Sequence, residues 1–362
     1  MSANPKFAPL DLRTVEGMLS FVDGHEDRET WIYVGLALKG EFGNDAFDAW
    51  DRWSANAGNY SEKTCRSTWR GLKCTESARG LGGLVNLAKA GGYTFDKESR
   101  PAPNLAELAA RRAERAERTA REAAERQRLA MSAEDQARAD WHAAQRTGTS
   151  AYATRKGIDA PESCRYIPAE HGGGLVIPML RYDLDRAQAL KGVQTIRDDG
   201  TKKFTYGMTK PGTACRLGLP VVGEPVFVCE GYATGMSLRM ALERRYPVFV
   251  AFDAYNLPPV VEAVHQCLPG SPIVICADDD YKTKIKGVAN NVGRIQAQVA
   301  MDSVMDAGAL LVVRTFPIFR KETARGDKDT DFNDLHRLEG LPEVAAQLQV
   351  CLDTLAELKK YG

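Results

Sequence analysis

The sequence lacks three features that would assign it to common classes of protein. No apolar run among its 362 residues approaches the roughly 20 residues that a membrane-spanning helix needs. The opening segment MSANPKFAPLDL has no apolar signal core, and no GxxxxGKS or GxxxxGKT phosphate loop occurs. We therefore expect a cytoplasmic protein that does not enter the membrane and has no P-loop motor of its own.

Zinc-ligand spacing is also missing. The eight cysteines form no C-x-x-C pair and have no histidine partner at zinc-ligand spacing. They are Cys65, Cys74, Cys164, Cys215, Cys229, Cys267, Cys276 and Cys351. The pattern predicts buried, reduced thiols and no structural zinc.

The chain has no net charge overall, but its charged residues are unevenly distributed. Residues 151–222 hold eleven Lys or Arg and seven Asp or Glu, a net of +4, whereas residues 223–345 hold thirteen and seventeen, a net of −4. A basic segment beside an acidic one is typical of a polyanion path next to a metal site.

Helical patterns occupy the amino-terminal part. Five segments within residues 1–95 place apolar residues at helical spacing, which predicts an all-α domain. On one predicted helix a basic face is formed by Lys63, Arg66, Arg70 and Lys73. This face suits DNA phosphates, and an ordinary solvated helix face explains it equally well.

Residues 96–149 are rich in Ala, Glu and Arg and have few large apolar side chains. N-cap signals at Asn104 and Ser132 predict two helices that break near Met131. We interpret this range as a charged helical linker.

Strand patterns begin near residue 150. Residues 150–222 predict a small mixed α+β subdomain with a hairpin turn at RDDGTKK. In residues 223–345, four apolar strands, PVFVC, PVFVAFD, PIVICAD and ALLVVRTFP, alternate with helical stretches. This alternation is typical of a parallel sheet flanked by helices, an α/β domain. Residues 346–362 predict a carboxy-terminal helix.

Carboxylates follow two of these strands directly. Glu230 follows the first strand and Asp278–Asp280 follow the third, so both groups are expected at the carboxyl edge of the sheet. Carboxylates brought together raise one another's pKa unless a cation is present, and an all-oxygen set suits Mg²⁺ or Mn²⁺. In extended backbone Asp278 and Asp280 point the same way and Asp279 points away. Farther on, DFNDL places Asp331, Asn333 and Asp334 at a helix start, where capping explains one of them.

The series E…ADDD…DFNDL resembles the Toprim domain, which occurs in bacterial and phage primases, topoisomerases, and some nucleases and recombination proteins. The resemblance implies that Glu230, Asp278 and Asp280 are catalytic and, with Asp334, hold metal, with two Mg²⁺ or Mn²⁺ ions expected. It also implies supporting roles for Asn256, Asn291, Gly293, Asp331 and Asn333.

The segments upstream favour a primase within this family. AYATRKGI and GGGLVIPMLRYD…KKFTYG resemble the basic, RNA-polymerase-like subdomain that precedes Toprim in phage and bacterial primases. The implied template- and nucleotide-binding residues are Arg155, Lys156, Lys191, Arg197, Lys202, Lys203 and Lys286. Residues 1–95 resemble the helical primase C-terminal type 2 (PriCT-2) domain of mobile-element primases.

Together these resemblances imply a DNA primase of a phage, plasmid or integrated element. Its expected partners are single-stranded DNA, nucleoside triphosphates and a helicase supplied by another protein. Two alternatives stay open. The same carboxylates with water as the nucleophile would make a metal-dependent nuclease, and a retained fold without activity would make a DNA-binding or partner-docking replication protein.

Overall fold

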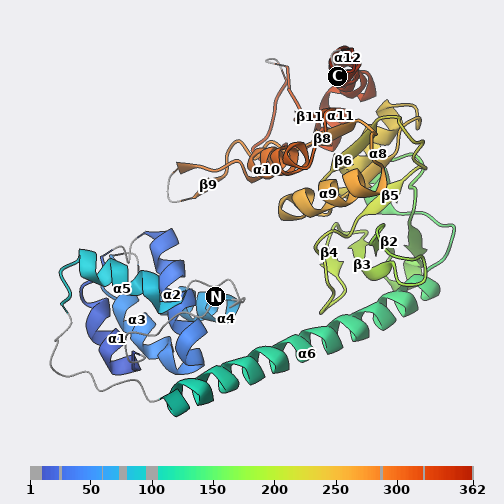
Figure 1. Cartoon of the computed structure of the whole chain (residues 1–362). Helices are drawn as coiled ribbons and strands as arrows, with labels where there is room; N and C mark the ends of the chain where they lie inside the picture. The colour runs from blue at the N-terminus through green and yellow to red at the C-terminus, as the bar shows by residue number, and fades with distance from the viewer. Residues whose placement is uncertain are drawn as a thin grey trace. The chain divides into compact units, whose positions relative to one another are not determined.

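A computed structural model describes residues 10–23, 27–58, 60–72, 80–94, 105–285, 288–320 and 323–360. They belong to two compact units, residues 1–123 and 124–362 (Figure 1). In the described ranges no helix is both long and apolar enough to cross a membrane.

The first unit contains the five predicted helices. They are α1 Leu12–Leu19, α2 Arg28–Phe42, α3 Phe47–Ser54, α4 Glu62–Gly71 and α5 Leu81–Ala90. The side chains of Asp11, Asp27 and Ser61 accept backbone N–H groups at the starts of α1, α2 and α4. These side-chain caps explain why the helices begin there.

Tryptophans form the centre of this small core. Trp50 is fully buried, stacks on Trp31 with ring centroids 4.5 Å apart, and tilts against Trp69 at 5.3 Å. The indole N–H of Trp50 donates to the carbonyl of Trp31 at 3.1 Å. One ring therefore connects α2, α3 and α4.

We expect Trp50→Ala to destabilise the first unit by about 3–5 kcal/mol, because it removes a large buried ring and leaves a cavity. Calorimetry of the full chain should show one transition moving to lower temperature while the transition of the second unit stays in place. A shift of both transitions by the same amount would contradict independent cores.

Residues 105–143 form a single helix, α6 Leu105–Ala143. The predicted break near Met131 is therefore wrong, and Asn104 lies outside the described residues. Ser132 has no Gly or Pro beside it to stop the helix, and the following turns pack, with Ala133 and Ala137 buried. Tertiary packing thus outweighs the local capping signal.

The last turns of α6 cover an antiparallel sheet in the second unit. This sheet has the order β1-β2-β3-β4, with β1 Arg165–Ile167, β2 Gly174–Leu180, β3 Leu190–Arg197 and β4 Lys202–Phe204. Ala137 packs with Val176 and Val193, and Lys191 pairs with Glu134 of α6 at 2.8 Å. The turn between β3 and β4 confirms the predicted hairpin.

The main sheet of the second unit has the order β11-β8-β6-β7-β5. Its strands are β5 Cys215–Leu217, β6 Val226–Cys229, β7 Val248–Val250, β8 Ile273–Cys276 and β11 Val312–Thr315. The four predicted strands pair in parallel, and β5 adds antiparallel to β7. The predicted α/β fold is therefore confirmed.

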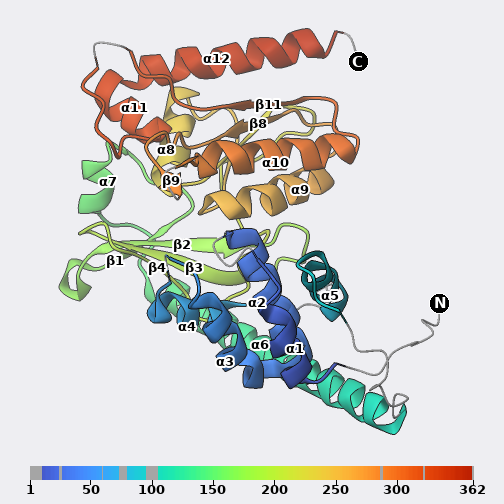
Figure 2. The ribbon, with the colours of Figure 1, turned by 90° about the vertical axis from the view of Figure 1, so that its left-hand side faces the viewer.

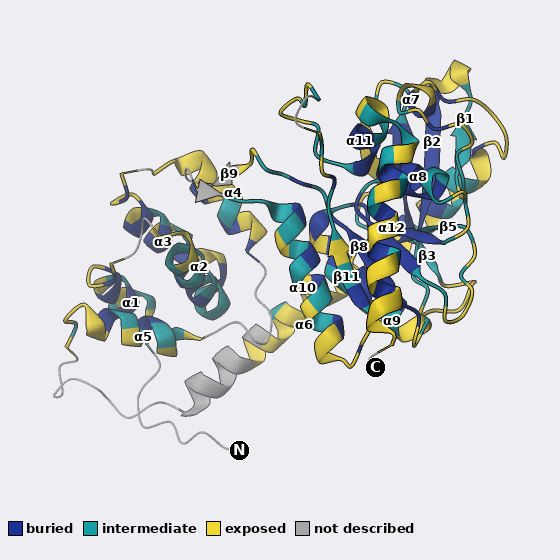
Figure 3. Cartoon of the chain, turned by 90° about the horizontal axis from the view of Figure 1, so that it is seen from above, coloured by how far each residue is buried: buried dark blue, intermediate teal, exposed yellow. Residues whose placement is uncertain are grey.

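Helices cover both faces of this sheet (Figure 2). One face packs against α8 Tyr232–Ala241, α11 Phe332–Glu339 and α12 Leu341–Leu358, and the other against α9 Leu257–Cys267 and α10 Val292–Asp306. Figure 3 shows the strand β8 buried between these layers. All four residues of β6 are buried as well. Apolar strands covered on both sides leave polar side chains only at the strand ends.

Candidate active site

Two predicted acids meet at the carboxyl edge of the main sheet. Glu230 lies between β6 and α8 and is 8% exposed, and Asp278 follows β8, the strand paired with β6. The backbone N–H of Asp278 donates to Oε1 of Glu230 at 3.3 Å. Residues 48 positions apart in the chain are thus in direct contact.

Asp280 is held by the start of α10. Its Oδ2 accepts the backbone N–H of Gly293 at 3.1 Å, and its own N–H donates to the side chain of Asn291 at 3.1 Å. Asn291 also caps α10 by accepting the N–H of Arg294. The predicted supporting residues Asn291 and Gly293 therefore contact the segment of Asp278 and Asp280 directly.

Burial and nearby negative charge raise the pKa values of Glu230 and Asp278. Burial is the main cause that raises the pKa of Glu230 from 4.5 to about 7, with the charges of Asp280 and Asp331 adding to it. The pKa of Asp278 lies well above its ordinary value, first because of burial and then because of Glu230 and Asp331. Close carboxylates in a dry setting cannot all ionise unless a cation neutralises them.

The raised pKa of Glu230 predicts how stability changes with pH in the absence of metal ions. The folded protein holds the proton of Glu230 more tightly than the unfolded chain does. The stability that this proton contributes is therefore fully present below pH 4.5 and is lost as the pH rises to about 7. We therefore expect the free energy of unfolding of Glu230→Gln to rise relative to that of the wild type by up to roughly 3 kcal/mol between pH 5 and 8. Urea unfolding in the presence of EDTA measures this difference. Parallel pH profiles of the two proteins would contradict this.

Asp331 and Asp334 have different surroundings. They form a capping box at the start of α11, in which Asp334 Oδ2 accepts the N–H groups of Thr330 and Asp331 at 3.0 and 3.3 Å. Oδ1 of Asp334 lies 3.8 Å from Lys156 Nζ. The charge of Asp331 adds to the raised pKa of both Glu230 and Asp278, and the charge of Asp334 makes a smaller addition to that of Asp278. Both side chains are engaged in the capping box, and Asp331 acts on Glu230 and Asp278 more strongly than Asp334 does.

The donor chemistry of this edge fits a hard divalent cation. Among the described residues, no three Asp, Glu, His or Cys side chains already converge as a complete ligand set. Oδ1 of Asp278 is nevertheless shielded from solvent and has no hydrogen-bond partner. A shielded, unpartnered carboxylate oxygen among other carboxylates is the environment that Mg²⁺ or Mn²⁺ satisfies.

Lys202 and Lys203 lie on opposite faces of the small sheet. Lys202 pairs with Ile196 and Lys203 with Thr195, and successive strand residues face opposite sides. Lys202 belongs to the acid side: desolvation lowers its pKa, and the charges of Asp331 and Asp278 act in the opposite direction.

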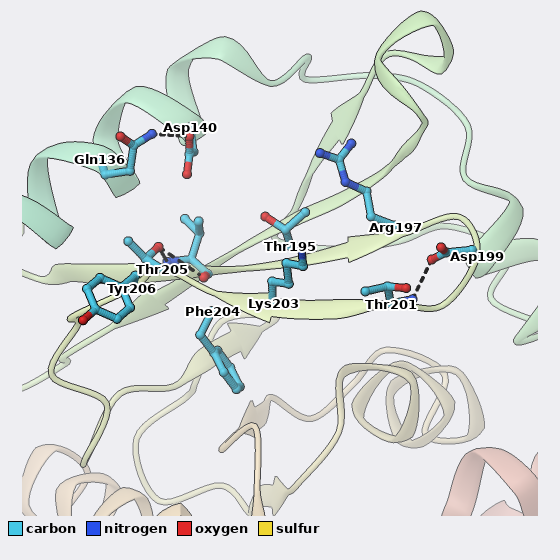
Figure 4. A pocket seen from close by; sticks show the side chains of 11 residues that line it. Gln136, Asp140, Thr195, Arg197, Asp199, Thr201, Lys203, Phe204, Thr205 and Tyr206 are labelled. Carbon is cyan, nitrogen blue, oxygen red and sulfur yellow. Dashed lines mark hydrogen bonds between the residues drawn. The ribbon is translucent and has the colours of Figure 1, made fainter. Parts of the chain in front are cut away.

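Lys203 instead lines a groove of about 520 Å³ between this sheet and α6. Figure 4 shows Thr195 and Arg197 pointing toward Gln136 and Asp140 of α6, whereas Phe204 points away from them. The adjacent residues Lys202 and Lys203 therefore belong to two different surfaces, the acid side and the groove beside α6.

Three other predicted template-binding residues have partners within the protein. Arg155 donates to the carbonyl of Asp198 at 2.8 Å, Lys191 pairs with Glu134, and Arg197 donates to the carbonyl of His171 at 2.7 Å. Lys286 lies outside the described residues. Two predicted cations are thus associated with the acids: Lys156, which lies 3.8 Å from Asp334, and Lys202, on which the charges of Asp331 and Asp278 act.

Two predicted supporting residues stabilise the surrounding framework. Asn256 is buried and donates to the carbonyls of Thr213 and Ala251 at 2.9 and 2.7 Å. Asn333 is buried and donates to the carbonyl of Lys156 and to the hydroxyl of Ser237, at 2.7 and 3.0 Å. Both connect segments around the acids without contacting them.

The predicted basic face in the first unit is only partly described. Lys63, Arg66 and Arg70 are exposed on α4, opposite the buried Cys65 and Trp69, and Lys73 lies outside the described residues. Arg66 pairs with Glu62 at 3.0 Å. The helix orientation matches the prediction, and a DNA-binding role for this face stays a prediction.

Two segments of the chain match known protein families. Residues 225–341 match the Toprim domain family and residues 15–88 match the primase C terminal 2 (PriCT-2) family. The chain therefore carries a Toprim domain and a PriCT-2 domain, and its resemblance to Toprim-domain DNA primases is confirmed.

Named relatives are primases. The chain is 32% identical to DNA primase TraC of Escherichia coli over 295 residues, which cover 75% of this chain and 25% of TraC. The chain thus spans about a quarter of the length of this relative.

Two solved structures are also similar. The primase fragment of the bacteriophage T7 primase-helicase protein has a TM-score of 0.38 and 15% identity, covering 54% of this chain and 69% of that chain. The second is a structure of the bacteriophage T7 lagging-strand DNA polymerase interacting with primase domains bound to an RNA/DNA hybrid and dTTP. It has a TM-score of 0.37 and 16% identity, covering 54% of this chain and 84% of that chain.

Proposed function

We propose that this protein is a DNA primase that makes short oligonucleotides on single-stranded DNA by metal-dependent nucleotidyl transfer. The observation that carries the proposal is the contact of Glu230 with the backbone of Asp278 at one sheet edge. The charge of Asp280 acts on Glu230 there, and the charge of Asp278 acts on Lys202 of the neighbouring basic sheet. Carboxylates beside a lysine are suited to a nucleoside triphosphate: the carboxylates would hold its divalent ions, and the lysine would contact its phosphates.

The residues have separate roles in this reaction. Glu230, Asp278 and Asp280, with Asp331 or Asp334, would hold two Mg²⁺ or Mn²⁺ ions. When bound, such ions would supply charge to activate a 3′-hydroxyl and to neutralise the pyrophosphate leaving group. Lys202 would contact the phosphates of the incoming nucleotide. The carboxyl edge orients these groups, because phosphoryl transfer depends mainly on positioning and charge.

The partners follow from the same chemistry. Single-stranded DNA would follow basic side chains of residues 151–222, nucleoside triphosphates would enter at the acid edge, and another protein would unwind the duplex. We place this activity in the cytoplasm, in the replication of a phage, plasmid or integrated element, as the resemblance to mobile-element primases supports.

One assay tests the function. The protein is incubated with unlabelled single-stranded DNA, labelled NTPs or dNTPs and Mg²⁺ or Mn²⁺, and in parallel with end-labelled DNA. New short oligonucleotides that require template support the proposal. Shortened template without synthesis indicates a nuclease, and neither product indicates a binding protein.

Salt dependence tests the template path. Single-strand affinity should fall with a log–log slope of about −0.7 for each phosphate contacted, so about four contacts would give a roughly fiftyfold loss between 50 and 200 mM salt. Fluorescence anisotropy with Lys203→Gln should show a slope shallower by about 0.7 if the groove beside α6 carries DNA. Lys360→Gln, at the far end of the chain, is the matched control and should leave the slope unchanged. An unchanged slope in Lys203→Gln would remove this groove from the path.

A further inference from the structure

The middle acid of the DDD triplet has a distinct environment. Asp279 is 3% exposed and lies against two arginines: Arg294 Nε is 2.8 Å from its Oδ1, and Arg325 Nη2 donates to its Oδ2 at 3.0 Å. Asn291 donates to the same Oδ1 at 2.7 Å. The contact with Arg294 is a charge contact rather than a well-directed hydrogen bond, because its Nε has no aligned acceptor.

Aromatic rings fix both arginines. The guanidinium carbon of Arg294 lies 3.3 Å from the ring centre of Phe316. That of Arg325 lies close to two rings, 3.8 Å from the centre of Tyr281 and 4.4 Å from that of Phe319. Planar cations stacked on rings keep their orientation and are partly desolvated, which strengthens their attraction to a carboxylate.

This cluster connects the segments that carry the predicted metal ligands. Arg294 follows Gly293, whose N–H donates to Asp280. The N–H of Asp279 donates to the carbonyl of Thr330 at 2.7 Å, directly before Asp331. Arg325 Nε donates to the carbonyl of Asp329 at 2.8 Å, in the same segment. Asp279 therefore joins the end of β8, the start of α10 and the segment that enters α11.

We propose that Asp279, Arg294 and Arg325 form a positioning cluster that holds Asp278 and Asp280 toward Glu230 before a metal ion binds. The flanking carboxylates repel each other, so a metal-free loop would relax outward unless another attraction held it. Two cations beside the intervening carboxylate supply that attraction. The inference rests on the proposed function only in taking the acid edge as the metal site.

Metal binding by the full chain tests the cluster directly. Asp279→Asn keeps the shape and removes the charge, and Arg325→Gln removes the stacked cation. Each should weaken Mn²⁺ binding by about ten- to a hundredfold, as loss of an outer partner of a metal ligand does. Free Mn²⁺ is measured by electron paramagnetic resonance, which needs no enzymatic activity. The double variant should bind about as weakly as either single variant, because both act through one contact.

The controls separate positioning from general stability. Arg320→Gln removes an arginine of the same segment that pairs with Glu339 and Glu343 instead, and it should leave Mn²⁺ affinity unchanged. Arg325→Lys keeps the charge without the planar stack and should give an intermediate affinity. If primer synthesis occurs, Arg325→Gln should need about tenfold more Mg²⁺ and recover most of its maximal rate. Unchanged Mn²⁺ affinity in folded Arg325→Gln, with only a lower melting temperature, would overturn the proposal, whether or not primers are made.

Discussion

Asp278→Asn is expected to reduce primer synthesis roughly a thousandfold or more. That loss corresponds to about 4 kcal/mol of transition-state stabilisation, a moderate share of what a catalytic metal supplies. Asp278 contacts Glu230 through its backbone N–H, and its side-chain Oδ1 is shielded and unpartnered, so this oxygen contributes no hydrogen bond to the fold. The rate is measured as labelled oligonucleotide formed per enzyme at saturating template and NTP.

The same substitution should not unfold the protein. Burial and nearby carboxylates raise the pKa of Asp278, so removing this ionisable group relieves repulsion, and the metal-free melting temperature should rise or stay constant. Asp306→Asn, an exposed acid at the end of α10, is the matched control and should retain normal synthesis. Normal synthesis by Asp278→Asn would end the assignment of the acid edge as the active site.

The sequence was sufficient to predict the acid edge because strand order and strand ends are both encoded locally. Apolar strands alternating with helices imply a parallel sheet, and carboxylates directly after two such strands must lie along one edge. The contact between Asp278 and Glu230 follows from that rule and from the pairing of β6 with β8. No long-range information beyond the fold class was needed.

Other features depended on packing that local patterns do not encode. The continuous α6 results from burial of Ala133 and Ala137, which outweighs a capping signal at Ser132. Which of Lys202 and Lys203 faces the acids depends on where β4 pairs with β3, since the short strand alone does not show which face is covered. The arginines on Asp279 come from residues 294 and 325, and only the tertiary fold brings them together.

Gly293 is the residue whose substitution should disturb the site most without removing a carboxylate. A Cβ at this position would lie 2.4 Å from the carbonyl oxygen of Asp278 and 2.9 Å from Oε1 of Glu230. The first atom is backbone and cannot move away without shifting the segment that carries Asp278 and Asp280. We therefore expect Gly293→Ala to reduce primer synthesis by about a hundredfold or more, the loss that misplacement of a reacting group by about 1 Å causes.

Stability measurements should separate this steric effect from the helical preference of alanine. Alanine inside a helix is favoured over glycine by about 1 kcal/mol, and overpacking costs about 1–3 kcal/mol, so Gly293→Ala should be neutral to destabilised. Gly17→Ala in α1 is the matched control: nothing lies within 4 Å of its Cβ, so it should stabilise the first unit and leave synthesis unchanged. Full activity in Gly293→Ala would mean that the backbone of Asp278 can move without harm, and rigid placement of the acid edge would then not be required for the reaction.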